Sequence, residues 1–324
     1  MIVDASWPRI PGICYDEAER AGRTEPRESH EPMPILFASL IVLGAAWTPP
    51  LEPLSRFDAR AIPEASGIVK SRRFPGIFWV HNDSGNAPWL FAVRSDGRIV
   101  RRFRLAIPNL DWEDIAIDDR GHLYLGDIGN NTGLLRTRVI YRIDEPDPSS
   151  PGDPDRPLAA TATVSYALPQ SNRFDAEGLV YDQGTAILVT KYLDGREAEL
   201  FAVPMDPPRP PPTRPVPVSI RPMGRLPSFT EPATGASLSE DRTLLAVCSY
   251  AVTRLYRRGE SPPWQLLAEV RYESLPIEGI TWDGRDLILA AEEGRGLYRL
   301  SEATWRAAGI ARRTDADRTP PKVK

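Results

Sequence analysis

Five oxygen-bearing side chains occupy equivalent positions in five copies of one phrase, and they are of the types that bind a hard cation. Three are glutamates and two carry hydroxyl groups: Ser66, Glu113, Glu177, Thr234 and Glu278. If the repeats close into a ring, these side chains converge, and carboxylates at short range cannot all stay ionised without a partner. Oxygen donors suit Ca²⁺, which accepts about six to eight of them, whereas Zn²⁺ favours His and Cys. We therefore predict a calcium-type metal site, with solvated turn acids as the alternative.

A second set of polar residues lies where the next strand of each repeat ends. It combines acid, amide, hydroxyl and ammonium groups, which indicates the rim of a polar pocket. We assign ligand binding to Asn82, Lys191, Ser249, Glu292, Tyr192 and Tyr250. If the site is catalytic, Asp127 or Glu113 is the expected general base, and His81 is the histidine best placed for acid–base work. The structural alternatives are a core role for His81 and an ion pair between Lys191 and Glu177.

Short apolar or alternating runs bounded by Gly, Asp, Asn or Pro surround these positions, which predicts strands. The first strands of the repeats cover 66–69, 113–116, 177–180, 234–237 and 278–281. The second strands cover 78–82, 123–127, 187–191, 245–249 and 287–292. The third strands, each with a Phe or Tyr, cover 90–93, 140–143, 200–203, 255–257 and 297–300. The fourth strands cover 101–107, 163–168, 218–226 and 267–275. Four-stranded units at this spacing predict a β-propeller.

The last repeat lacks a fourth strand, because the pattern over Ala303–Ala311 is helical instead. Leu54–Ile62 has the character of a fourth strand and stands alone before the first repeat. An N-terminal strand that completes the final sheet closes the ring and protects its edges. We predict an all-β, five-bladed propeller over residues 48–311. A six-bladed ring is the alternative and needs a further blade.

The segments outside the propeller indicate export. The apolar run Pro34–Trp47 has about 14 residues, short of the roughly 20 that span a membrane, and Gly44-Ala45-Ala46 suits a signal peptidase. We interpret 33–47 as a signal peptide or N-terminal anchor, 1–32 as a leader from an over-called start, and 312–324 as a disordered tail. A buried core helix over 33–47 is the alternative. We expect a secreted, periplasmic or cell-envelope protein, with no transmembrane domain in the mature chain.

Composition excludes several classes of function. The 40 basic and 44 acidic residues are interspersed, so no basic face for nucleic acid is expected. Two cysteines make no disulfide framework, and Cys248 lies in an apolar strand pattern. Neither a nucleophile elbow nor a Walker loop occurs in the sequence. We expect a monomer whose partner is a small molecule or a protein.

Several phrases resemble those of a family of secreted bacterial β-propellers. They are Trp112-Glu113-Asp114-Ile115-Ala116, Gly126-Asp127-Ile128-Gly129-Asn130-Asn131, Tyr141-Arg142 with Glu145-Pro146, Asp175-Ala176-Glu177-Gly178 and Thr234-Gly235-Ala236-Ser237. The resemblance extends over 64–300 and implies the same fold and export.

A more distant similarity is to the soluble calcium-activated nucleotidases (apyrases), which are also five-bladed. It lies in Leu123–Gly129, whose pattern is Leu-Tyr-x-Gly-x-x-Gly. The resemblance implies a central Ca²⁺ with one ligand from each blade, at the five ring positions named above. The chain departs from the family at Glu64–Ile68, in place of Ser-His-Gly-Arg-Gly, and at Asn130–Gly133, in place of Lys-Glu-Trp-Thr. The similarity therefore implies a metal site at the five ring positions and leaves open whether the protein hydrolyses nucleotides.

Three functional hypotheses follow. In the first, the protein is a metal-assisted hydrolase of a phosphate ester or phosphoanhydride, with Glu113 or Asp127 as base. In the second, the metal is structural and the loops bind a ligand or a protein. In the third, Asp127 and Glu292 form a glycosidase-like pair, which requires a separation of about 5–10 Å. Basic anion contacts beyond Lys191 would favour the first over the second.

Overall fold

The computed structural model describes residues 51–317, apart from 151, 154–155, 206–215, 261–262, 274 and 294. For residues 310–317 only the backbone is described. The predicted leader, the apolar run over 33–47 and the last seven residues of the predicted tail lie outside the described residues.

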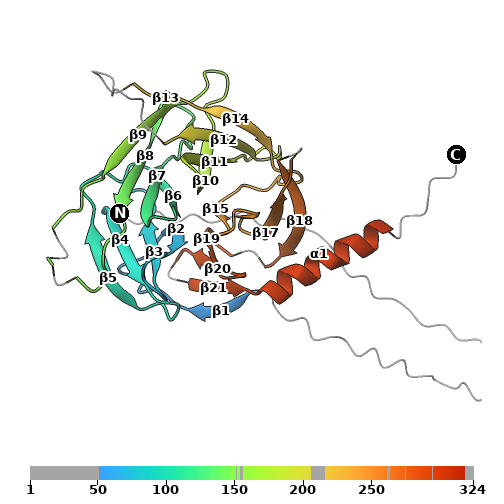
Figure 1. Cartoon of the computed structure of the whole chain (residues 1–324), viewed down its shortest axis with the longest axis horizontal. Coiled ribbons are helices and arrows are strands. Elements are labelled where there is room, and N and C mark those ends of the chain that lie inside the picture. The colour runs from blue at the N-terminus through green and yellow to red at the C-terminus, as the bar shows by residue number, and fades with distance from the viewer. Residues whose placement is uncertain are drawn as a thin grey trace, which may run out of the picture. The chain divides into compact units, whose positions relative to one another are not determined.

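The strands form five sheets around a central axis, so the chain is a five-bladed β-propeller as predicted (Figure 1). Blade 1 contains β2 (Ala65–Lys70), β3 (Phe78–Asn82), β4 (Trp89–Val93) and β5 (Ile99–Arg104). Blade 2 contains β6 (Trp112–Ile117), β7 (His122–Asp127), β8 (Thr137–Asp144) and β9 (Ala162–Ala167). Blade 3 contains β10 (Asp175–Asp182), β11 (Thr185–Lys191), β12 (Glu199–Pro204) and β14 (Arg221–Arg225). Blade 4 contains β15 (Gly235–Leu238), β16 (Leu244–Cys248), β17 (Val252–Arg258) and β18 (Trp264–Arg271). Blade 5 contains β19 (Ile277–Asp283), β20 (Asp286–Ala291), β21 (Gly296–Leu300) and the N-terminal β1 (Glu52–Ser55).

An N-terminal strand closes blade 5, as predicted, but its bounds differ from the predicted Leu54–Ile62. β1 pairs antiparallel with β21 over only Glu52–Ser55. The chain then turns, because the backbone N–H groups of residues 61 and 62 both donate to Asp58 O at 2.9 Å. Phe57 and Ile62 are buried in the core between blades 5 and 1. The closing element is therefore a short strand followed by a turn segment whose apolar side chains are buried between the two blades.

Two other predicted elements change their bounds. The fourth strand predicted over 218–226 divides into β13 (Val218–Ser219), which pairs parallel with β9 of blade 2, and β14, which completes blade 3. The predicted C-terminal helix is α1 (Glu302–Asp317), which continues past residue 311 and packs on β18. In the described part of the chain, no helix is long and apolar enough to cross a membrane.

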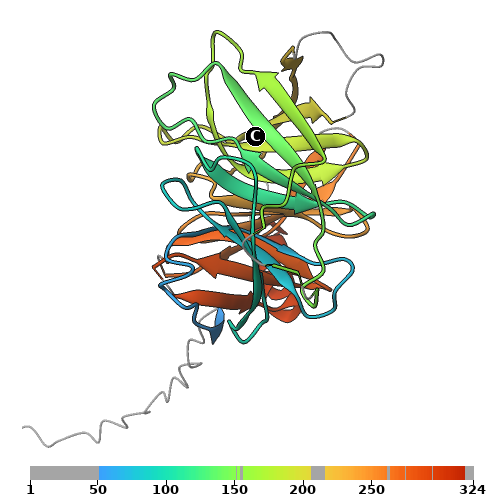
Figure 2. The same cartoon turned by 90° about the vertical axis from the view of Figure 1, so that its left-hand side faces the viewer.

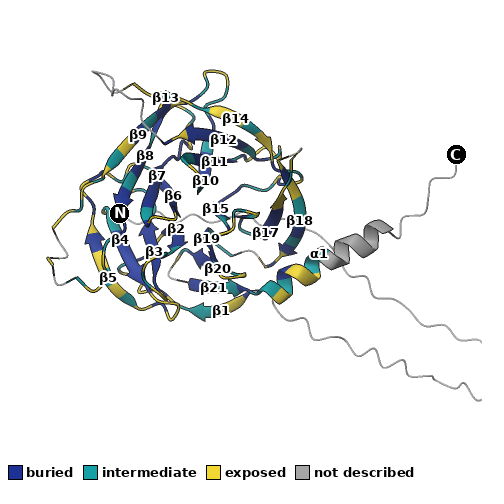
Figure 3. Cartoon of the chain, viewed as in Figure 1, coloured by how far each residue is buried: buried dark blue, intermediate teal, exposed yellow. Residues whose placement is uncertain are grey.

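The apolar core lies between the blades. Five clusters of buried side chains are present, one at each interface of neighbouring blades. Burial decreases outward: every residue of β6 is buried, whereas the outer strand β5 alternates between covered and exposed side chains (Figure 3). The connecting loops lie on both sides of the sheets (Figure 2). We call the face where the inner strands begin the upper face, and the face where they end the lower face.

Deletion of residues 1–63 tests the closure. It removes β1 together with Phe57 and Ile62, whose burial contributes about 1.5–3 kcal/mol each, and it exposes the edge of β21. We expect this variant to melt well below, or to aggregate more than, a variant that lacks only residues 1–48. Equal melting temperatures in a thermal scan would show that β1 does not hold the ring closed.

Candidate functional site

β-bulges turn the predicted ring residues away from the regular ladder. In blade 2 the partners of residues 112 and 114 are consecutive on β7, so Glu113 is the extra residue. Glu177 and Glu278 are the extra residues in blades 3 and 5, and a bulge also covers Ser66 in blade 1. A bulge bends its strand and redirects a side chain. The same local device therefore recurs in four blades at the upper face.

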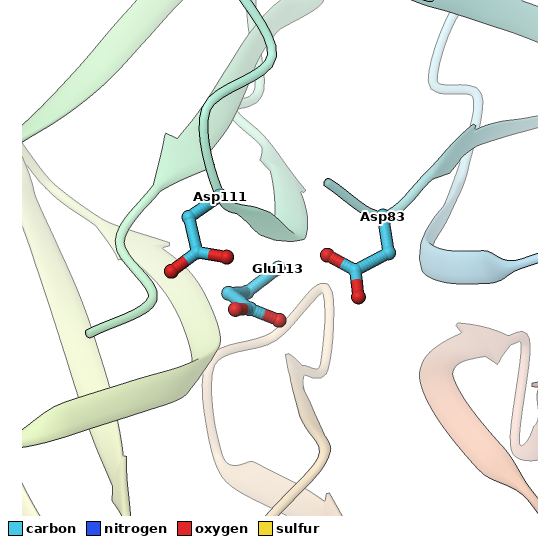
Figure 4. A group of neighbouring side chains, drawn as sticks. All are labelled: Asp83, Asp111 and Glu113. Carbon is cyan, nitrogen blue, oxygen red and sulfur yellow. The ribbon is translucent and has the colours of Figure 1, made fainter. Parts of the chain in front are cut away.

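Carboxylates from three blades meet at the upper face. Asp83, Asp111 and Glu113 have oxygen atoms within 4.8 Å of one another, and so do Glu113, Asp175 and Glu177. Figure 4 shows the first three side chains pointing toward one another. We call these five residues the acid cluster. Glu113 belongs to both groups and is its centre.

The carboxylate of Glu113 has no partner in the described part of the chain. Its side chain is only 5% exposed, and neither a hydrogen bond nor an ion pair reaches it. Burial raises the pKa of Glu113 well above its usual range, and the charges of Glu177 and Asp83 raise it further. A buried carboxylate in this position requires either a proton or a bound cation.

Gly129 forms a backbone wall of the acid cluster. A Cβ atom at this position would lie 2.5 Å from Asp111 Oδ2 and nearer still to Glu113 Oε1. The adjacent N–H of Asn130 donates to Asp175 Oδ1 at 2.6 Å. The glycine therefore leaves room between carboxylates, and the neighbouring amide orients one of them. This donor set, made of carboxylate oxygens alone, fits a hard cation.

The other half of the upper face holds Lys191, Tyr250, Glu278 and Glu292. Lys191 Nζ is paired with Glu177 Oε1 and lies 3.4 Å from the Tyr250 hydroxyl. Burial raises the pKa of Glu278 to about 7, although the Lys191 charge opposes this shift. Burial, followed by the charge of Asp83, also raises the pKa of Glu292 to about 7.

The two predicted hydroxyl ligands link blades instead of joining the acid cluster. Ser66 Oγ donates to the backbone oxygen of Glu113 at 2.6 Å. Thr234 Oγ1 donates to the backbone oxygen of Ile277 at 2.7 Å. Of the five predicted metal ligands, the structure thus brings Glu113 and Glu177 into the acid cluster. It places Glu278 beside Tyr250 and Lys191.

Two predicted catalytic residues, Asp127 and His81, are buried and in contact with residues of the core. Asp127 is 2% exposed and forms a 2.6 Å ion pair with the buried Arg138, while its Oδ1 accepts the N–H of Asp111 at 3.1 Å. His81 is fully buried, packs edge-on against Trp112, and burial lowers its pKa to about 4. Asp127 therefore positions Asp111, and His81 is a neutral core residue, so neither prediction of a catalytic role is supported.

Three of the predicted ligand-binding residues hold loops. Asn82 Nδ2 donates to Ala61 O at 3.0 Å, Ser249 Oγ accepts the N–H of residue 251, and the Tyr192 hydroxyl donates to Glu199 at 2.7 Å. The other three predicted residues, Lys191, Tyr250 and Glu292, lie close to the acid cluster.

Three members of the acid cluster were absent from the predicted ligand set: Asp83, Asp111 and Asp175. Asp111 and Asp175 each stand two residues before a ring glutamate, in Asp111-Trp112-Glu113 and Asp175-Ala176-Glu177. The same Asp-x-Glu spacing in two repeats was a usable signal, because it places a second carboxylate two residues from each of these ring glutamates. Asp83 follows β3 directly, and only the ring geometry brings it to Glu113.

Comparison with known proteins gives a likeness of fold only. No protein-family model matches the chain, and no curated protein matches it. A nidogen/laminin complex is similar at 12% identity over 74% of this chain and 76% of that chain, with a TM-score of 0.40. The PQQ-bound aldose sugar dehydrogenase of Streptomyces coelicolor is similar at 12% identity over 78% of this chain and 83% of that chain, with a TM-score of 0.43. Catalytically inactive virginiamycin B lyase from Staphylococcus aureus with quinupristin is similar at 15% identity over 72% and 65% of the two chains, with a TM-score of 0.37.

Substitution of Gly129 by Ala tests the role of the backbone wall. Because the added methyl group overlaps the carboxylates of Glu113 and Asp111, we expect their separation to change and stability to fall by about 1–3 kcal/mol. Gly152→Ala is the control, since its nearest neighbour would lie at 3.6 Å. Equal thermal stability of Gly129→Ala and wild type would refute this close contact.

The raised pKa of Glu278 predicts a dependence of stability on pH. In the folded protein this group holds its proton up to about pH 7, against an ordinary value of 4.5. The unfolded state therefore ionises first, and in EDTA the stability of the fold falls between about pH 4.5 and pH 7. Glu278→Gln removes this loss. We expect the variant to gain roughly 1–2 kcal/mol over wild type above pH 7 and almost nothing at pH 4.5.

Urea unfolding at several pH values measures this difference, with exposed Glu260→Gln as the control. A difference between Glu278→Gln and wild type that is the same at all pH values would contradict the assignment.

Proposed function

We propose that the upper face binds a hard divalent cation of the Ca²⁺ type, and that the protein is a metal-dependent binding propeller. The observation that carries this proposal is the carboxylate of Glu113, buried and unpartnered among four other carboxylates. Asp83, Asp111, Glu113, Asp175 and Glu177 would hold the ion. Their oxygen atoms come from three blades, so a bound ion would also link those blades.

The distribution of positive charge favours a cation over an anionic ligand in direct contact with the acid cluster. The positive charges that act most on these carboxylates are those of Lys191 and Arg138. Lys191 is paired with Glu177, and Arg138 with Asp127. Neither is free to receive a phosphate or a carboxylate. This arrangement supports the binding function above a phosphohydrolase.

A second candidate function is metal-assisted hydrolysis of a phosphate ester or phosphoanhydride. It is favoured by Glu278 and Glu292, because a carboxylate with a pKa of about 7 suits general-base catalysis at neutral pH. A bound cation would supply the positive charge that polarises a phosphoryl oxygen. The base would then be Glu278 or Glu292, in place of the predicted Asp127. A glycosidase-like pair of Asp127 and Glu292 finds no such support, because the Asp127 carboxylate is already in an ion pair with Arg138.

Thermal and urea unfolding in EDTA and in Ca²⁺ test the cation site. At a Ca²⁺ concentration roughly a hundredfold above the Kd, the wild-type fold should gain about 2.7 kcal/mol. Glu113→Gln keeps the shape of the side chain and removes the free-energy cost of keeping a buried carboxyl group protonated at neutral pH. It should therefore be at least as stable as wild type in EDTA and should show little response to Ca²⁺.

Two further variants make this result specific. Glu177→Gln leaves Lys191 without its ion-pair partner, so it should be less stable than Glu113→Gln in EDTA. Glu145→Gln alters a buried carboxylate outside the acid cluster, which accepts a 2.7 Å hydrogen bond from Trp79 Nε1, and should keep the full Ca²⁺ response. No gain in stability for wild type with Ca²⁺, and no co-purified metal, would overturn the proposal. A panel of phosphoanhydride and phosphate-ester substrates then tests the hydrolase.

A further inference from the structure

The lower face carries a cleft between blades 2 and 3. Its volume is about 360 Å³, which is within the range of small-molecule sites. The acid cluster lies where β6 and β10 begin, and the cleft lies where they end, so the two sites occupy opposite ends of the same strands. The residues that line the cleft and carry polar or aromatic groups include Arg120, His122, Tyr124, Arg142, Tyr181 and Arg242.

The acidic groups of the cleft are already satisfied. Asp118 accepts the backbone N–H groups of residues 120 and 122 at 2.8 and 2.9 Å. Its second oxygen accepts the His122 ring nitrogen at 2.8 Å and the Tyr124 hydroxyl at 3.1 Å. Asp119 is paired with Arg242. These carboxylates fix the walls of the cleft and have little remaining capacity to bind a cation.

Two arginines of the cleft lack a compensating charge. Neither Arg120 nor Arg142 forms an ion pair within the described part of the chain, and Arg142 donates only to Thr161 Oγ1 at 3.3 Å. Arg142 is the register partner of Tyr124, so both side chains stand on the same face of blade 2. That face packs against blade 3, because Tyr124 belongs to the apolar cluster that the two blades share. Arg142 is therefore held at the mouth of the interface.

An aromatic surface adjoins these arginines. The rings of Tyr124 and Tyr181 stack with centroids 4.1 Å apart and an interplanar angle of 15°, which joins the two walls. Two turn residues of the cleft adopt backbone conformations that favour glycine: Gln183 with φ 45° and Arg242 with φ 58°. Side chains retained at such positions carry a cost of roughly 1–2 kcal/mol, and they are more frequent at ligand-binding sites.

We propose that this cleft binds a small organic anion with a planar group. A carboxylate or phosphate group would lie between Arg120 and Arg142, since guanidinium groups bind both in a bidentate manner. The planar part would lie against Tyr181. Both head groups share this chemistry, and the site is independent of the acid cluster.

Isothermal titration calorimetry of the full chain at low ionic strength tests the proposal with phenyl phosphate, benzoate and inorganic phosphate. We expect saturable binding of phenyl phosphate or benzoate in the millimolar range or tighter. The tighter of the two identifies the preferred head group. Inorganic phosphate should bind more weakly than phenyl phosphate, because it lacks the ring. The double variant Arg120→Gln, Arg142→Gln should bind about tenfold more weakly or worse.

Three controls make the outcome decisive. Arg104→Gln changes an exposed arginine of β5, away from the cleft, and should bind as wild type does. Glu113→Gln should also bind normally, since it alters only the upper face. Arg120→Gln alone changes an exposed side chain, so it gives a folded comparison if the double variant is unstable. The proposal is overturned if neither ring-bearing probe binds saturably, or if Arg104→Gln weakens binding as much as the cleft variants.

Discussion

The carboxylate of Asp114 holds the inner strands of three blades together at the propeller axis. It is fully buried and accepts the N–H of Ile115 in its own blade at 2.8 Å, of Leu179 in blade 3 at 2.8 Å and of Ala236 in blade 4 at 3.1 Å. Burial raises its pKa well above the usual range, and these three donors oppose the shift. Blade-to-blade hydrogen bonds from Ser66 and Thr234 extend the same scheme around the ring. With the inner strands tied in this way, their starting residues must converge at the upper face.

This convergence explains why some sites could be predicted and others could not. The five repeats, their strands and the N-terminal closure could be read from the sequence, because strand periodicity and turn residues are local signals. The convergence of Glu113 and Glu177 followed from the ring. The interblade roles of Ser66 and Thr234 did not, because their hydroxyl groups reach backbone oxygens 47 and 43 residues away. The division of the predicted strand 218–226 also depends on a neighbouring blade, because β13 pairs with β9 of blade 2.

The ion pair that surrounds Asp127 could not be predicted from the sequence. Arg138 lies eleven residues later, beyond a glycine-containing loop, and only the pairing of β7 with β8 brings its side chain to Asp127. His81 illustrates the same limit. Gly67 of the inner strand β2 lies directly against the His81 ring, and a Cβ atom at residue 67 would overlap this ring. The close packing holds the imidazole inside the core. In both cases the surroundings of the side chain depend on how neighbouring strands pair and pack.

The buried carboxylates of this propeller differ in how their charge is compensated, and in this respect Glu113 differs from the others. Asp114 has three backbone donors, Asp127 has Arg138, and Glu177 has Lys191. Glu145 accepts hydrogen bonds from Ser71 and Trp79. In each case the compensating group belongs to the protein itself. Glu113 has no such partner, although it is as deeply buried and has four further carboxylates near it. The cation proposed for the acid cluster would give Glu113 the compensating positive charge that no described side chain supplies.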